Sequence, residues 1–286
     1  MALKTVLVTG GAGLAAASIA SAAPAGVRVI VTRPQPVQPA GQGNFASADW
    51  TDAEQAARLF DEYRFDAVAH CLEPSGRAGA DHVQSTRNIV GLCSERGAYL
   101  VYVSGNEVFD GSAGPYGEDD PVSPVSAPGK LHVACEMLAV TGLEECAVAR
   151  PSLMFGLAGT DCPAGMIMTA LGAGKQLTLP EDLFDNPVSG RQFGEAVWRM
   201  LETRPWGAVH IAGRDSVSRH EFGLRVAAAC GLDRTLLTPA RGGNSKDTGT
   251  CAVNIALKTA KMEQELGIAA SGLETALADL FPARPV

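Results

Sequence analysis

The sequence predicts an α/β protein built on a Rossmann-type doubly wound parallel sheet, with a smaller C-terminal α/β lobe. Through the first half, short apolar runs alternate with longer helical patterns, as they do when a parallel sheet is covered by helices on both faces. The first apolar run leads directly into a glycine-rich turn that opens a helix. After about residue 155 the alternation loosens, so we expect the second half to form a separate lobe.

The expected core strands are short and almost wholly apolar, which is typical of strands buried in a parallel sheet. They cover residues 5–9, 27–32, 66–71, 99–104 and 146–151. The helices between them are expected up to about residue 22, from a capping box of Thr51 and Glu54 to about residue 63, and around 80–96 and 130–141. These elements assign residues 1–155 to the core.

The second half is expected to form an α/β lobe. Its predicted elements are helices near 163–173, in the second half of NPVSGRQFGEAVWRMLE, from a cap of Ser218 and Glu221 to about residue 230, and near 257–266 and 273–281, with a strand at 208–213. We expect residues 156–286 to be mainly a substrate-binding lobe, with some elements returning to the core and a cleft between the two parts.

The glycine turn VTGGAGLAAA predicts a dinucleotide site. Gly10 permits a tight turn, and Gly13 lets the backbone approach a pyrophosphate at the N-terminus of a helix. Ala16 is small enough for helix–strand packing, and Leu14 follows the second glycine in the same turn. The plain alternative is a tight turn that binds nothing, but the strand before the motif and the helix after it favour cofactor binding.

The end of the second strand favours NADP(H) over NAD(H). An acidic residue there would hold the ribose 2′-hydroxyl of NAD, whereas the sequence has Thr32 and then Arg33, which suits a 2′-phosphate. Arg33 taken alone is equally compatible with a solvated loop charge. Asp49, in the segment ADWTD, would either contact the adenine edge or begin the helix that follows.

Composition excludes several classes. The net charge of −8 argues against a nucleic-acid surface, and no apolar run reaches the roughly 18–20 residues that a membrane span needs. The seven cysteines show no CxxC or Cys/His spacing, so we expect no metal site, buried thiols and a cytoplasmic protein. The N-terminus imitates a signal peptide, but its glycine turn explains the pattern better.

Motifs along nearly the whole chain resemble the extended short-chain dehydrogenase/reductase superfamily, closest to the dTDP-4-dehydrorhamnose reductase and epimerase/dehydratase group. VLVTGGAGLAA resembles the family's TGxxGxxG, and VYVSGNEVFDG its S-T-D-x-V-F-D-G. PYGEDDPVSP, ARPSLMFG, HIAGRDSVSRHEF and NIALKTAKMEQELGI resemble further segments of the family. The resemblance implies the Rossmann fold, a nicotinamide cofactor and a homodimer.

The resemblance implies catalysis by a Ser or Thr, a Tyr and a Lys, with the lysine lowering the pKa of the tyrosine. Placed residue by residue on this sequence, the lysine is Lys130 and the tyrosine position is Ser126. The Ser/Thr position, just after Ser104, is Gly105. Because an aliphatic hydroxyl is far less acidic than a phenol, the usual ketoreductase mechanism is disfavoured. Lys130 is then expected to hold cofactor or substrate.

Glu107 is the leading candidate for the missing proton carrier. The related sugar-nucleotide 4,6-dehydratases have S-T-D-E-V-Y-G at this turn, where the Asp and Glu act as acid and base. This sequence keeps the Glu as Glu107 and has Asn106 for the Asp. A carboxylate in a cleft can have its pKa raised toward neutrality and so shuttle protons. The alternative is a rim carboxylate without a chemical role.

Other candidates lie at strand ends and in the lobe. His70, Cys71 and Leu72 end or follow a core strand, where ligands of parallel sheets bind, although a core histidine and a buried thiol are the plain alternatives. His82 stands where relatives carry an active-site Asn. Arg191 is able to pair with a diphosphate or carboxylate, or to be an exposed helix residue. Further lobe candidates are Met166, Gln176, Phe184 and Arg214.

These observations predict an NADP(H)-binding oxidoreductase, or an epimerase/dehydratase-like enzyme, with non-standard acid and base residues. Its substrate would be a sugar nucleotide or another small polar carbonyl or hydroxyl compound, and we expect no nucleic-acid or membrane partner. One alternative is a catalytically inactive, cofactor-binding regulatory subunit, since a fold does not fix a function. Another is a nicotinamide-independent enzyme that uses the same cleft.

Overall fold

The computed structural model describes residues 3–11, 13–33, 45–71, 79–156, 162–241 and 253–281. A seven-stranded sheet lies at its centre in the order β11-β6-β5-β4-β1-β2-β3, with all neighbouring strands parallel. Its strands are β1 (Thr5–Val8), β2 (Arg28–Arg33), β3 (Phe45–Ser47), β4 (Ala67–His70), β5 (Tyr99–Val103), β6 (Cys146–Pro151) and β11 (Gly207–Ile211). The chain winds outward from β1 in both directions, which confirms the predicted Rossmann-type fold.

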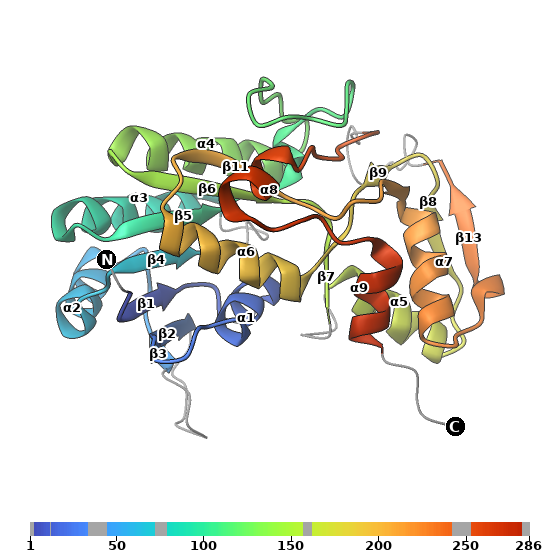
Figure 1. The fold of residues 1–286 in the computed structure, drawn as a ribbon, viewed down its shortest axis with the longest axis horizontal. Helices are drawn as coiled ribbons and strands as arrows, with labels where there is room; N and C mark the ends of the chain where they lie inside the picture. Colours follow the sequence, from blue (N-terminus) through green and yellow to red (C-terminus); the bar gives the residue numbers. More distant parts are fainter. Residues whose placement is uncertain are drawn as a thin grey trace.

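Helices cover both faces of this sheet (Figure 1). One apolar core joins the sheet to α1, α6 and α8, and a second joins it to α2, α3 and α4. Because successive strand residues point to opposite faces, Val6 belongs to the first core and Leu7 to the second. The helices are α1 (Leu14–Ser21), α2 (Ala53–Tyr63), α3 (Gly79–Arg96), α4 (Ala127–Gly142), α6 (Gly190–Thr203) and α8 (Ala260–Leu266).

The first turn of α2 differs from the sequence prediction. The N-cap is Asp52, whose carboxylate accepts hydrogen bonds from the backbone N–H groups of Glu54 and Gln55. The capping box expected from Thr51 and Glu54 is therefore wrong by one residue. The Thr51 hydroxyl instead donates to Asp49 Oδ1 at 2.7 Å, so Asp49 belongs to the turn that leads into the helix.

The C-terminal lobe consists of small elements around its own apolar core, which includes a ring contact between Phe155 and Phe222 at 5.6 Å. Three two-stranded sheets pair β10 with β7, β12 with β9, and β13 with β8. The elements are β7 (Met154–Phe155), α5 (Pro163–Gly172), β8 (Leu177–Pro180), β9 (Phe184–Asp185), β10 (Val188–Ser189), β12 (Val217–Ser218), α7 (Arg219–Ala229), β13 (Leu237–Ala240) and α9 (Leu273–Leu280). Three elements from the second half of the sequence, α6, β11 and α8, pack with the central sheet and not with the lobe.

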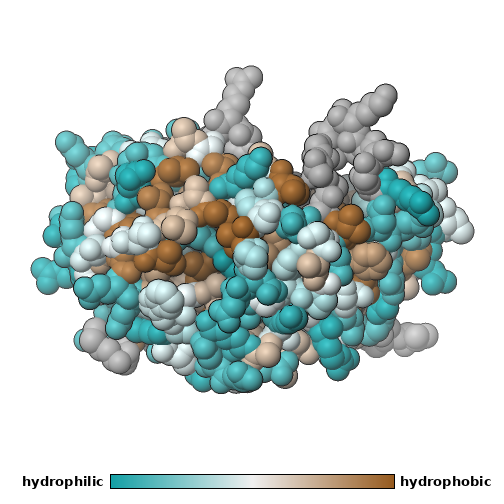
Figure 2. Space-filling view, turned by 90° about the horizontal axis from the view of Figure 1, so that it is seen from above, coloured by the Kyte–Doolittle hydropathy of each residue, from teal (hydrophilic) through white to brown (hydrophobic). Residues whose placement is uncertain are grey.

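Most of the described cysteines are buried, as the sequence predicts. Cys71, Cys93, Cys135, Cys146 and Cys162 are buried, and no described helix is long and apolar enough to cross a membrane. Figure 2 shows apolar side chains gathered on the face seen from above, toward the side on which α4 lies. Met137 of α4 is exposed, with 54% of its surface accessible. The homodimer expected from the sequence stays a prediction.

Candidate functional site

The turn between β1 and α1 has the geometry that the glycine motif predicts. Gly10 has a φ of 72°, a left-handed conformation that favours glycine. The N–H of Gly13 donates to the carbonyl of Gly10 at 3.0 Å, and Gly13 is the N-cap of α1 without a side-chain cap. Ala16 is fully buried beneath the turn. The first N–H groups of α1 are therefore not taken by a capping side chain, which suits an anion.

A cavity of about 400 Å³ opens beside this turn, between the core and the lobe. The start of α1, the segment after β5, the start of α4 and the segment after β6 contribute its walls from the core side. The lobe contributes α5 and α7. Its lining residues are Leu14, Ala15, Ser104, Gly105, Asn106, Glu107, Pro128, His132, Pro151, Ser152, Leu153, Met154, Pro163 and Arg219.

Glu107 lies in this cavity on a short 3-10 helix, Asn106–Val108, that follows β5. Its side chain is partly buried, and desolvation raises its pKa above the ordinary value. A hydrogen bond from its own backbone lowers the pKa in part, the nearby Asp185 raises it further, and Arg219 opposes Asp185. A carboxyl group of this kind holds its proton to a higher pH than an exposed glutamic acid does.

The carboxyl group of Glu107 fills the space in front of Gly105. A Cβ atom built on Gly105 would lie 2.3 Å from Glu107 Oε2, closer than real contacts allow. Gly105 is the position at which the resembled family has its Ser or Thr. A side chain there would force the Glu107 carboxyl group to move, so glycine is what permits its present place in the cavity.

The start of α4 corrects the placement of two predicted catalytic residues. Ser126 is the N-cap of α4, and its Oγ accepts a hydrogen bond from the N–H of Gly129 at 3.1 Å. Lys130 is exposed, and neither residue lines the cavity. The helical positions four residues apart that do line it are Pro128 and His132, two residues further along the chain. The structure therefore brings His132, and not Lys130, together with Glu107.

A buried row of ring side chains extends behind the cavity from His132. Its Nδ1 lies 3.0 Å from the hydroxyl of Tyr102, and that hydroxyl lies 3.1 Å from Nε2 of His82. Desolvation lowers the pKa of each histidine to about 4, so both are neutral at pH 7. His82 is thus a buried partner of Tyr102 and does not line the cavity.

His70 belongs to the interior. Its Nδ1 lies 2.9 Å from Thr9 Oγ1 and its Nε2 lies 3.1 Å from Thr86 Oγ1. Burial lowers its pKa to about 3, and its side chain is fully inaccessible. The N–H of Cys71 also donates to Thr9 Oγ1, at 3.0 Å. His70 ends β4 and Cys71 follows it, but neither lines the cavity, which favours the plain alternative given for them.

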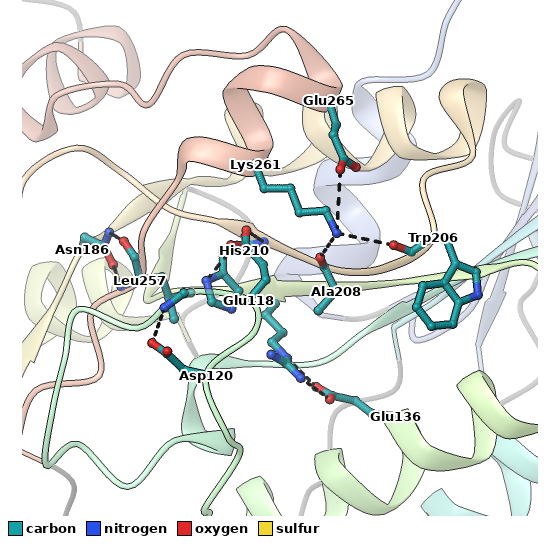
Figure 3. A network of polar contacts seen from close by, with 12 residues as sticks. Glu118, Asp120, Glu136, Asn186, Trp206, Ala208, His210, Leu257, Lys261 and Glu265 are labelled. Carbon is teal, nitrogen blue, oxygen red and sulfur yellow. Dashed lines mark hydrogen bonds and ion pairs between the residues drawn. The ribbon is translucent and has the colours of Figure 1, made fainter.

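Ser104 lines the cavity and also contacts Glu136, a member of a buried ion pair that is labelled in Figure 3. Its hydroxyl donates to Glu136 Oε1 at 2.5 Å, and Arg150 donates to both oxygens of Glu136, at 3.0 and 2.7 Å. The guanidinium also lies over the ring of Phe109, 5.5 Å from its centre. The hydroxyl of Ser104 is therefore already held by the carboxylate of Glu136.

The lobe side of the cavity is organised by Asp185. One carboxylate oxygen accepts a hydrogen bond from Asn106 at 2.9 Å, and the other accepts from Nε of Arg219 at 2.5 Å. Asp185 is almost fully buried, whereas the side chain of Arg219 is 27% exposed and lines the cavity. The geometry directs a positive group toward the cavity, a feature that sequence reasoning missed. The correctly predicted Ser218 cap was its only local signal.

Several predicted residues lie elsewhere. Arg191 begins α6 and lines a second cavity of about 460 Å³, where it pairs with Asp279 at 2.8 Å. Leu72 and the side chain of Arg33 lie outside the described residues. None of the other lobe candidates lines the cavity that holds Glu107, namely Met166, Gln176, Phe184 and Arg214. Within the described ranges no cluster of His, Cys, Asp and Glu suits a metal ion.

Comparisons with known proteins agree with this architecture. A family model described as "RmlD substrate binding domain" matches residues 4–284. The probable low-salt glycan biosynthesis reductase Agl14 of Haloferax volcanii is 25% identical over 81% of this chain and 82% of its own length. Methionine adenosyltransferase 2 subunit beta of Rattus norvegicus is 25% identical, and the match covers 68% of this chain and 64% of that protein. A dTDP-4-dehydrorhamnose reductase of Bacillus anthracis, solved with NADP, superposes with a TM-score of 0.82 at 16% identity, covering 98% and 99% of the chains.

Proposed function

The chain belongs to the RmlD substrate binding domain family, and from this premise we propose that it is a nicotinamide-dependent oxidoreductase acting on a sugar nucleotide or a similar polar carbonyl compound. The family match confirms the resemblance drawn from the motifs. The observation that carries the proposal is the carboxyl group of Glu107, which occupies the cavity beside the glycine turn with a raised pKa. The name of the Haloferax relative, a reductase of glycan biosynthesis, supports the same chemistry.

The residues around the turn fit a dinucleotide. Gly10 gives the backbone the required turn, and Gly13 leaves the N-terminus of α1 without a competing side chain. When bound, a nicotinamide cofactor would supply or accept a hydride. NADP(H) is the proposed form because Arg33 is the last residue of β2, the strand end at which NAD sites have an acid.

In this proposal Glu107 carries the proton. In the direction of reduction its protonated carboxyl group gives a proton to the substrate oxygen, and in the direction of oxidation its carboxylate takes the proton back. Arg219, held at Nε by Asp185, would attract an anionic part of the substrate with its remaining donors. Asn106 donates a hydrogen bond to Asp185 and so keeps that carboxylate oriented. Asp185 and Arg219 would therefore act as one unit.

Cofactor binding is tested by a substitution at Gly13. Gly13→Asp places a carboxylate at the N-cap, where Asp is favoured for helix stability but repels a pyrophosphate. We expect wild type to bind NADPH more tightly than NADH, and the Asp variant to bind NADPH at least about tenfold more weakly, which corresponds to about 1.4 kcal/mol. Fluorescence titration of the purified protein measures both.

The control is Gly13→Asn, which has nearly the same shape without the charge. It should retain more of the affinity for NADPH than the Asp variant does. Tighter binding of NADH would overturn the choice of NADP(H), and no binding of either cofactor would overturn the nicotinamide proposal itself.

A second candidate function is a regulatory subunit that binds a cofactor without turnover. It is favoured by one observation, that no tyrosine is among the residues lining the described cavity. The likeness to methionine adenosyltransferase 2 subunit beta, a protein named as a subunit, supports it. The two candidates separate on activity: a regulatory subunit that binds NADPH shows no NADPH oxidation with any keto-sugar nucleotide.

A further inference from the structure

Resting on the function proposed above, we propose that His132 is a second catalytic residue, a neutral imidazole whose Nε2–H donates a hydrogen bond to the substrate oxygen that Glu107 protonates. Tyr102 acts through it as a positioning residue, because its hydroxyl fixes which ring nitrogen carries hydrogen. The usual tyrosine and lysine would thus be replaced by a carboxylic acid and a neutral histidine.

The two side chains converge on one point. A Cβ atom built on Gly105 would lie 2.3 Å from Glu107 Oε2 and 3.6 Å from His132 Nε2. Both residues line the same cavity, although they come from different elements, the 3-10 helix after β5 and the second turn of α4. A substrate oxygen bound in the cavity beside the Glu107 carboxyl group would therefore also be near the imidazole nitrogen of His132.

The far nitrogen of His132 is held by a fully buried hydroxyl. Tyr102 has one hydrogen to donate and lies between His132 Nδ1 at 3.0 Å and His82 Nε2 at 3.1 Å. It can donate to only one histidine, and its oxygen can accept from the other. When Tyr102 donates to His132 and His82 donates to Tyr102, the hydrogen of His132 lies on Nε2, the nitrogen on the side of Gly105.

The surroundings keep this imidazole neutral. Burial lowers the pKa of His132 to about 4, although the nearby Glu136 carboxylate opposes that shift. The charge of Glu136 is already shared between Ser104 and Arg150, so it gives His132 no direct partner. A neutral histidine is too weak an acid to lose its proton, but it polarises a carbonyl group by hydrogen bonding.

The chemistry balances with NADPH as the second reactant. In the reduction, the carbonyl carbon would gain a hydride from NADPH, which leaves as NADP⁺, and the π electron pair of the C=O bond would move to the oxygen. Glu107 gives that oxygen its carboxyl proton and is left as a carboxylate, while His132 keeps its Nε2–H throughout. Solvent then returns a proton to Glu107. Hydrogen-bond donors placed at a developing oxyanion are worth about 10²–10³ in kcat.

Paired substitutions test the role. His132→Leu should lower kcat for NADPH-dependent reduction by about 10²–10³-fold, with little change in NADPH affinity. His132→Gln, whose amide N–H lies near the position of Nε2–H, should restore most of that loss. The substrates are a panel of keto-sugar nucleotides that begins with dTDP-4-dehydrorhamnose. If His132→Leu keeps full activity, the role of His132 is overturned while the proposed function stands.

A second measurement does not depend on turnover. Nitrogen-15 NMR of the ring nitrogens should show His132 neutral at pH 7 with its hydrogen on Nε2, and Tyr102→Phe should disturb that preference. A charged ring, or hydrogen on Nδ1 in wild type, overturns the proposal. Absence of wild-type turnover with the whole panel overturns the proposed function, and this role with it.

Discussion

Replacing Glu107 by Gln is expected to lower kcat by about 10²–10⁴-fold, the usual worth of a general acid or base. The amide keeps the size of the side chain and its place in front of Gly105 but has no proton to give. Because burial raises the pKa of Glu107, its acid form persists to higher pH than in an exposed glutamic acid. Wild-type reduction should therefore fall as pH rises through that pKa, and the variant should lose this dependence. Steady-state kinetics across a pH series measures both.

The matched control is Glu144→Gln, a substitution of an exposed glutamate that does not line the cavity with Glu107. It should leave kcat and the pH profile unchanged. NADPH affinity should stay the same in both variants, because no step of cofactor binding is assigned to Glu107. Full activity of the Glu107 variant would show that the proton comes from another group.

Breaking the buried ion pair is expected to cause the largest loss of stability. Glu136→Leu leaves the guanidinium of Arg150 charged and unpaired in the interior, and one of its nitrogens already has no partner. The free energy of unfolding should fall by about 3–5 kcal/mol. Denaturation by urea, followed by circular dichroism, gives this value.

Two further variants locate the cause. Glu136→Leu combined with Arg150→Met removes both charges and should recover most of the stability. Asp279→Ala breaks the exposed pair with Arg191 and should cost less than about 1 kcal/mol. A loss below 1 kcal/mol for Glu136→Leu alone would mean that water reaches the guanidinium and the pair does not support the fold.

The features predicted correctly from the sequence are those that depend on residues close together in the chain. The glycine turn, the core strands and the Ser218 cap follow from residues that are neighbours in the chain, and each is confirmed. Glu107 could be put forward from the sequence for the same reason, since it lies within one short motif, and the structure places it in the cavity. Its catalytic role stays a prediction.

The helix α4 lies where the sequence predicts it, but the residues expected to face the site from it do not line the cavity, because its start offers two pairs at helical spacing. Ser126 and Lys130 resemble the catalytic pair by their position in the sequence, but only the fold shows that Pro128 and His132 line the cavity. Asp185 lies far from Glu107 in the chain, and no spacing rule connects them. Such contacts depend on how the lobe folds back on the core, which a single sequence does not show.

The joint between core and lobe has a consequence for motion. The chain passes between them repeatedly, after β6, before α6, after β11, before α8 and again before α9. Across this joint the packing is tight, because a Cβ atom built on Gly156, just after β7 of the lobe, would lie only 2.8 Å from a methyl carbon of Leu14 at the start of α1. A hinge needs few crossing strands and a loose interface, and neither is present here. The cavity should thus be preformed, so that a ligand enters it without a swing of one half of the molecule against the other.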